Sequence, residues 1–266
     1  MFEVKGGYPI YELSHKRVDE PCATDYGRHM HNCCELLLFI RGDANYNIDG
    51  LTYRPKPYDL LIIPRATYHY VIPVSPMPYE NYVLDFAGDL LPPVHCKKVF
   101  ARPLIINIRE DKEFYSFFKR LDLYHETYLQ EDFIYAVKSL LREMLIYCSY
   151  RMERSVIVEQ ERPPLVDTIL RMISDNIEQP LDAEFLAKEL MLSKSYLQNI
   201  FSQTMHIGLK QYIMQKKIFA AHNDLEKGMT SKAVCEKYCF SDYSVFFRIY
   251  KKTMGYSPKQ TKLYKS

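Results

Sequence analysis

Residues 239–258, CFSDYSVFFRIYKKTMGYSP, decide how the C-terminal part of the chain folds. Ser241 and Asp242 can cap the free N–H groups at the start of a helix. The apolar residues that follow recur at helical spacing, at Val245, Phe246, Ile249 and Tyr250. The opposite face is polar and cationic, so the stretch predicts a recognition helix. If this stretch is considered alone, the simpler interpretation is an ordinary amphipathic surface helix.

A short segment precedes this helix and makes the pair a helix-turn-helix. Thr230 can cap it, and a brief connection leads from it into the recognition helix. Upstream, Asp182 and Ser193 can cap two further apolar-periodic segments, which predicts a second helix-turn-helix. Residues 209–225 between the two pairs predict a helix about 25 Å long. Such a spacer suits two recognition helices that lie about 34 Å, one DNA turn, apart.

These residues resemble the AraC-type transcription regulators over residues 163–262. The matching residues keep the family's spacing without a gap: Leu181, Leu186, Ala187, Ser193, Leu197, Phe201, Tyr212, Ala221, Phe240, Asp242, Phe246, Arg248, Lys251, Gly255, Ser257 and Pro258. His206 and Cys239 stand where the family usually has Gly, and Lys217 stands where it has Arg. Because Gly serves unusual backbone conformations, we expect such conformations at His206 and Cys239.

Both recognition helices expose side chains that suit double-stranded DNA. They are Lys194, Ser195, Gln198 and Asn199 on the first, and Tyr243, Ser244, Phe247, Arg248 and Lys251 on the second. Gln and Asn can read adenine, Arg suits guanine and Phe the thymine methyl group, whereas Lys251 suits a phosphate. The alternative for each is a solvated side chain. For Arg248, the resemblance also implies a structural salt bridge as an alternative.

Length and composition allow two domains, and the distribution of charge supports the DNA-binding interpretation. Residues 162–266 hold 16 Lys or Arg against 10 Asp or Glu, and the remainder holds 19 against 23. The basic excess coincides with the predicted DNA-binding part, although a solvated charged face would look similar. We expect no secretory signal and no membrane span, and seven reduced cysteines, hence a cytoplasmic protein.

Short runs rich in β-branched and aromatic residues fill residues 8–105 and predict strands. Asp49-Gly50 between two of the runs is a strong hairpin signal. The regular spacing predicts a small antiparallel barrel or jelly roll. This part resembles the cupin fold of sugar-type AraC regulators, so the predicted fold class is α+β, with a cupin-like barrel, a helical hairpin and an all-α domain.

The cupin resemblance implies a set of ligand-binding residues at the barrel mouth. His29, His31, Glu35 and His69 match the ligand types of a metal cupin. Regulatory cupins often keep such residues without a metal, so we expect a small-molecule pocket with no cofactor, lined by these four residues together with Tyr46 and Tyr53. Each tyrosine has an alternative as a buried core residue.

Residues 111–157 change to helical spacing, with an acidic break at residues 130–132, and predict a helical hairpin. It can cover the barrel, form a dimer seam, or do both. The predicted domains are therefore 1–110 for the ligand, 111–157 for the hairpin, 158–164 for a linker and 165–266 for DNA.

The expected function is an effector-responsive transcription activator that is not an enzyme. Its expected partners are double-stranded DNA, a small molecule for which a sugar is one candidate, RNA polymerase and a second copy of the chain. The alternative is a metal-dependent cupin enzyme with an appended DNA-binding domain.

Overall fold

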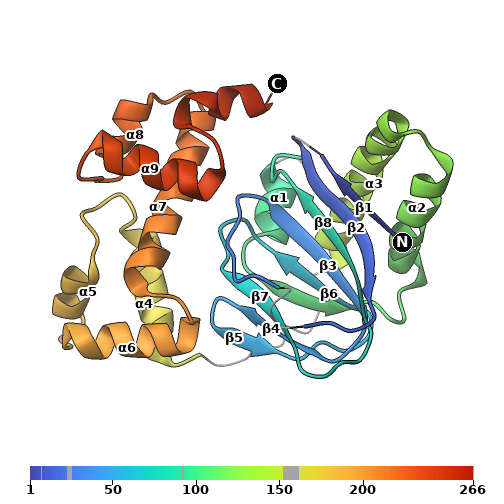
Figure 1. Cartoon of the computed structure of the whole chain (residues 1–266), viewed down its shortest axis with the longest axis horizontal. Helices are drawn as coiled ribbons and strands as arrows, with labels where there is room; N and C mark the ends of the chain where they lie inside the picture. The colour runs from blue at the N-terminus through green and yellow to red at the C-terminus, as the bar shows by residue number, and fades with distance from the viewer. Residues whose placement is uncertain (7, 23–25, 91–92, 152–161, 266) are drawn as a thin grey trace. The chain divides into compact units, whose positions relative to one another are not determined.

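The computed structural model describes residues 1–6, 8–22, 26–90, 93–151 and 162–265. The chain divides into two compact units, Met1–Gln160 and Glu161–Ser266. The first carries two sheets and a helical hairpin, and the described part of the second is helical (Figure 1). This confirms the predicted α+β class.

The strands of the first unit form two antiparallel sheets, with the orders β1-β2-β8-β3-β6-β9 and β5-β4-β7. Their bounds are β1 Phe2–Lys5, β2 Ile10–Val18, β3 Cys34–Arg41, β4 Ala44–Ile48, β5 Leu51–Tyr53, β6 Asp59–Ile63, β7 His69–Pro73, β8 Tyr79–Phe86 and β9 Leu104–Asn107. β4 and β5 pair across Asp49-Gly50, where φ is 48° and 82°, which confirms the predicted hairpin. β1 begins at Phe2, earlier than the strand region predicted from residue 8.

The central strand β3 connects two apolar cores because both of its faces are buried. Leu37 and Phe39 belong to the core that also contains Tyr46 and Ile48 of the smaller sheet. Leu36 and its alternate neighbours belong instead to a larger core on the outer face. A strand buried on both faces reads as a continuous apolar run, as β3 does.

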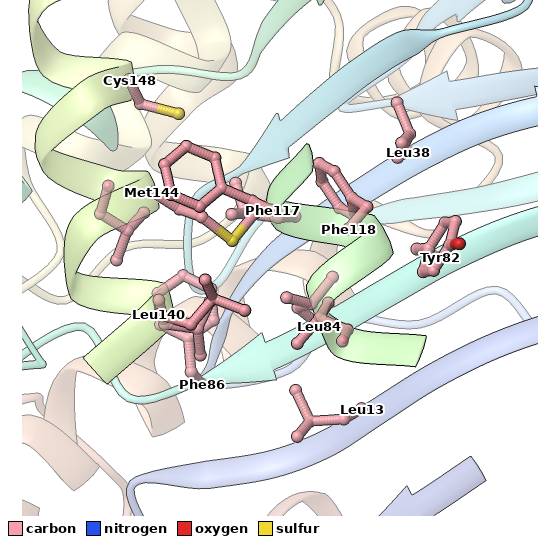
Figure 2. Close-up of a cluster of buried hydrophobic side chains, with 14 of the residues drawn as sticks. Leu13, Leu38, Tyr82, Leu84, Phe86, Phe117, Phe118, Leu140, Met144 and Cys148 are labelled. Atoms are coloured by element: carbon pink, nitrogen blue, oxygen red, sulfur yellow. The ribbon is translucent and has the colours of Figure 1, made fainter. Parts of the chain in front are cut away.

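The predicted helical hairpin is confirmed and covers that outer face. It consists of α2, Lys112–Thr127, and α3, Gln130–Arg151, and residues 152–157 of its predicted range lie outside the described residues. Figure 2 shows Phe118 of α2 and Leu140 of α3 beside Tyr82 and Phe86 of β8. The short helix α1, Pro93–Val99, was not predicted.

The second unit contains the two predicted helix-turn-helix pairs. Its helices are α4 Pro164–Asp175, α5 Ala183–Glu189, α6 Lys194–Met205, α7 Leu209–Glu226, α8 Ser231–Lys237, α9 Tyr243–Met254 and the 3-10 helix η3 Pro258–Lys265. The side chains of Asp182, Ser193, Thr230 and Asp242 all accept N–H hydrogen bonds at helix starts, which confirms these caps. In the described part of the chain, no helix combines the length and apolarity that crossing a bilayer requires.

The turns of the two pairs have the same backbone construction. After α5, Leu192 N–H donates to Ala187 O and Met191 N–H to Lys188 O; after α8, Phe240 N–H and Cys239 N–H repeat the pattern. This is the Schellman arrangement, which requires a left-handed residue after the cap. Met191 and Cys239 each have φ 54°, and so does His206 at the end of α6. The unusual conformations expected at His206 and Cys239 are therefore confirmed.

Met191→Gly is expected to raise the free energy of unfolding by about 0.5–1 kcal/mol. Met191 is 93% exposed, so the change removes left-handed strain without removing buried contacts. Urea denaturation measures the effect. Met191→Ala is the control, because it shortens the side chain but keeps the strain; equal stability of the Gly and Ala variants would contradict the prediction.

Candidate ligand and nucleic-acid sites

Four residues predicted from the sequence converge in the first unit. Glu35 Oε2 lies 3.1 Å from His31 Nε2 and 3.0 Å from His69 Nε2. The His29 ring centroid lies 4.4 Å from that of His69, and backbone hydrogen bonds join these two residues in both directions. One donor atom from each of the four residues can be chosen so that all lie within 4.8 Å of one another.

The three imidazoles share a common mode of anchoring. Nδ1 of His29 lies 2.7 Å from Gly27 O, Nδ1 of His31 lies 3.1 Å from Cys33 O, and Nδ1 of His69 lies 2.9 Å from Thr67 O. A carbonyl can only accept, so each Nδ1 carries the proton in these contacts. The lone pair of a neutral ring is then on Nε2, and a backbone hydrogen bond of this kind orients a histidine for ligand binding.

The carboxylate at the centre of this cluster is strongly held in its charged form. Burial by itself raises the pKa of Glu35, but electrostatic attraction to the neighbouring His69 and His31 rings outweighs burial and holds that pKa well below the usual range. Glu35 and His69 are buried, whereas His31 is partly exposed and His29 is exposed. The anionic Glu35 therefore lies at the buried end of the cluster, and the cluster is exposed to solvent on the side of His29.

The donor set of this cluster fits a divalent transition-metal ion. Three imidazole nitrogens and one carboxylate oxygen are ligand types that suit Zn, Fe, Mn or Ni. Such an ion would supply a Lewis-acidic centre that binds an anionic or hydroxyl oxygen. The anchored rings give the metal alternative a physical basis that sequence spacing alone did not provide.

The two tyrosines predicted to line the pocket have other partners. Tyr46 is buried, and its hydroxyl is hydrogen-bonded to that of Tyr79. The Tyr53 hydroxyl donates to Asp59 Oδ2 at 2.5 Å. Both hydroxyls are thus engaged within the sheet unit, and the four-residue cluster remains the candidate ligand site.

Two further residues beside the cluster were missed in the sequence. Cys33 Sγ lies 3.0 Å from His31 Nδ1, and Asp85 pairs with Glu35 across β8 and β3. Within the described residues, Asp85 Oδ1 is buried without a hydrogen-bond partner. Burial and the nearby Glu35 raise the pKa of Asp85 to about 8. Only the strand register brings Asp85 here, so no local sequence signal marks it.

The second unit presents the predicted DNA-contacting side chains on its recognition helices α6 and α9. Lys194, Ser195, Asn199, Tyr243, Ser244, Arg248 and Lys251 are exposed, and Gln198 and Phe247 are partly exposed. Tyr196, which was not predicted, is 50% exposed on α6. In the part of the chain that the structure describes, Arg248 has no ion pair that would represent the alternative structural role.

The second helix-turn-helix is supported by a buried carboxylate on α7. Asp224 Oδ2 accepts hydrogen bonds from Lys237 Nζ and from the Tyr238 hydroxyl, both at 2.8 Å. Burial raises the pKa of Asp224, but these donors outweigh burial and lower it. The charged form is thus the one that the fold stabilises.

Asp224→Asn is expected to lower the free energy of unfolding by about 1.5–3 kcal/mol at neutral pH, because the amide cannot replace hydrogen bonds made to a charged group. A carboxylate whose pKa is lowered in the folded state stabilises the fold at a pH above its pKa in the unfolded chain, near 3.8. This stabilisation is lost as the pH falls through the pKa of the folded state. The difference between the two proteins should therefore shrink below about pH 4. Urea denaturation at neutral and acidic pH measures it, and a pH-independent difference would contradict the prediction.

Comparisons with known proteins give a family-model match in each unit. A family model described as "AraC-like ligand binding domain" matches residues 20–121, and one described as "Helix-turn-helix domain" matches residues 186–263. The chain is 24% identical over 258 residues to the HTH-type transcriptional regulator YdiP of Escherichia coli, which covers 90% of this chain and 82% of that protein.

Two other regulators match this chain over shorter segments. The chain is 34% identical over 61 residues to the regulatory protein SoxS of Salmonella typhimurium, covering 23% of this chain and 57% of SoxS. It is 30% identical over 96 residues to the Msm operon regulatory protein of Streptococcus mutans, covering 36% of this chain and 34% of that protein. A solved structure of ToxT from Vibrio cholerae aligns over 96% of this chain and 98% of ToxT, with 11% identity and a TM-score of 0.42.

Proposed function

We propose that the chain activates transcription in response to a small molecule bound at the histidine cluster. The premise is that it is an AraC-type DNA-binding transcription regulator with an AraC-like ligand-binding domain. We assign ligand binding to residues 1–110, dimerisation to 111–157 and DNA binding to 165–266, with 158–164 as linker. Residues 158–161 of that linker lie outside the described residues.

The proposed reading of DNA bases is supported by two helices, α6 and α9, that expose polar side chains and both pack against α7. Asn199 and Gln198 of α6 can read adenine, and Arg248 of α9 can read guanine. Selection from a random-sequence duplex pool with the full-length chain, followed by footprinting, tests this. We expect two protected half-sites about one helical turn apart. Failure to enrich any sequence above a non-specific duplex would contradict the proposal.

The cluster of His29, His31, Glu35 and His69 supports the effector site. A ligand changes DNA binding only through different affinities for two states of the protein. Carbohydrates are the first class to test, because imidazoles and a carboxylate can hydrogen-bond sugar hydroxyls. Thermal shift against a sugar panel, with and without divalent metal, identifies binders, and operator affinity with each binder then tests the switch.

The exposed apolar residues of the hairpin support a homodimer. Tyr135 and Tyr150 of α3 are 71% and 66% exposed, and Leu129 between the helices is 80% exposed. Such residues suit a second copy of the same face. Activation also requires contact with RNA polymerase, which reporter transcription with purified polymerase would test.

The histidine cluster also favours a second candidate function, a metal-dependent enzyme in the first unit. Metal analysis of protein purified without added metal separates the two candidates. Tight stoichiometric metal that is absent from His31→Ala, together with turnover of a bound sugar, would favour the enzyme.

A further inference from the structure

The loop between α4 and α5 reaches out of the first helix-turn-helix module and onto the second. Ile177 in this loop packs against the core formed by α7, α8 and α9. Glu178 Oε1 lies 3.0 Å from Lys237 Nζ, and the Glu178 carbonyl accepts from Cys239 Sγ at 3.3 Å. The two modules are therefore joined at a point away from the ends of α7.

Lys217 in the middle of α7 completes this junction. Its Nζ donates to Gln179 O at 2.8 Å and to Tyr238 O at 2.9 Å, and the residue is 3% exposed. Tyr238 ends α8, where unpaired carbonyls and the helix dipole favour a cation. A buried ammonium is costly unless hydrogen-bonded, so both carbonyls must stay in place to satisfy it.

The two ends of α7 pack against different modules. Tyr212 near its start contacts Phe201 of α6, with ring centroids 5.4 Å apart. Ala221 and Leu225 near its end belong to the core with α8 and α9. A single shared helix would leave the modules free to bend about it, whereas a second connection removes that freedom.

We propose that these contacts, which we call the inter-module latch (Ile177, Glu178, Gln179, Lys217, Lys237, Tyr238 and Cys239), fix the separation and rotation of α6 and α9. The domain then recognises the spacing between two half-sites as well as their bases, and Lys217 is its main positioning residue. This inference rests on the proposed sequence-specific binding of duplex DNA.

The test measures affinity as a function of half-site spacing. A duplex selected with the wild-type chain is remade with one or two base pairs inserted or removed between the footprinted half-sites, and binding is followed by fluorescence anisotropy. One base pair moves a half-site by about 3.4 Å and about a tenth of a turn. We expect the affinity of wild type to fall about tenfold or more for each base pair inserted or removed. The affinity of Lys217→Met should vary by less than about threefold across the same series.

Two further variants separate positioning from charge. Lys217→Arg should restore the steep profile, because a guanidinium can also donate to two carbonyls. Lys210→Met removes the same charge at an exposed position near the start of α7 and should leave the shape of the profile unchanged, whatever it does to overall affinity. A steep profile in folded Lys217→Met protein would overturn the proposal.

If Lys217→Met does not fold by circular dichroism, Lys217→Gln carries the test, because its polar end can remain beside the buried carbonyls but is uncharged and shorter than the lysine side chain. A flattened profile in Lys217→Gln supports the latch, and an unchanged profile overturns it. If the wild-type chain selects no duplex, the proposed function itself is contradicted. If wild type selects a site but the variants depend on half-site spacing as wild type does, only the latch is rejected.

Discussion

Divalent zinc or nickel added to the metal-free chain is expected to raise its melting temperature by about 5–10 °C at a concentration of about 100 times Kd. Binding at that ratio stabilises the folded state by about 2.7 kcal/mol. Each kcal/mol raises the melting temperature of a domain of this size by about 2–4 °C. The physical reason is the convergence of His29, His31, Glu35 and His69 within 4.8 Å, with each imidazole anchored through Nδ1. Differential scanning fluorimetry measures the shift.

The metal prediction has a matched pair of variants. His31→Ala removes one of four ligands and, if affinity falls about 100-fold, leaves only about 0.4 kcal/mol of stabilisation at the same concentration. His95→Ala removes a histidine of the same unit whose Nδ1 contacts Ser149 Oγ, outside the cluster, and should keep the full shift. Equal shifts in both variants would place the stabilising metal outside the cluster, and no shift in wild type would contradict metal binding by these four residues.

The parts of the fold that depend on local sequence were predictable. Asp182, Ser193, Thr230 and Asp242 cap helices through N–H groups two or three residues away, so their signal lies in a short window. His31 and Glu35 are likewise only four positions apart, with His31 just before β3 and Glu35 within it. The short elements α1 and η3 were missed, because a single turn or two carries too little periodicity to mark a helix.

Features that depend on distant pairing were not predictable. Asp85 reaches the cluster only because β8 pairs with β3 in a particular register. Lys217 bonds carbonyls of residues 38 and 21 positions away, and backbone carbonyls leave no trace in residue type. In the sequence, Lys217 stands out only as a departure from the family's Arg, which does not indicate its role. Tyr46 and Tyr53 were of suitable type for a pocket, but their hydroxyls bond elsewhere because tertiary packing decides the partner.

The double change Asn199→Ala with Arg248→Ala is expected to reduce affinity for a selected duplex by about 2–6 kcal/mol. Each side chain is exposed on a different recognition helix, each base contact is worth about 1–3 kcal/mol, and changes at well-separated sites add. Repeating the selection with each single variant should relax one base position, in the half-site read by α6 for Asn199 and by α9 for Arg248.

The control for base reading is Lys251→Ala on the exposed side of α9. Removing a phosphate-binding cation at this position weakens selected and non-specific duplexes alike and lowers the slope of log affinity against log salt by about 0.9. Asn199 carries no charge, so Asn199→Ala should leave both the salt slope and non-specific binding unchanged while affinity for the selected site falls. Uniform weakening across all sequences by Asn199→Ala would contradict base reading by α6. It would leave phosphate binding and DNA shape as the source of affinity, because neither distinguishes one base edge from another.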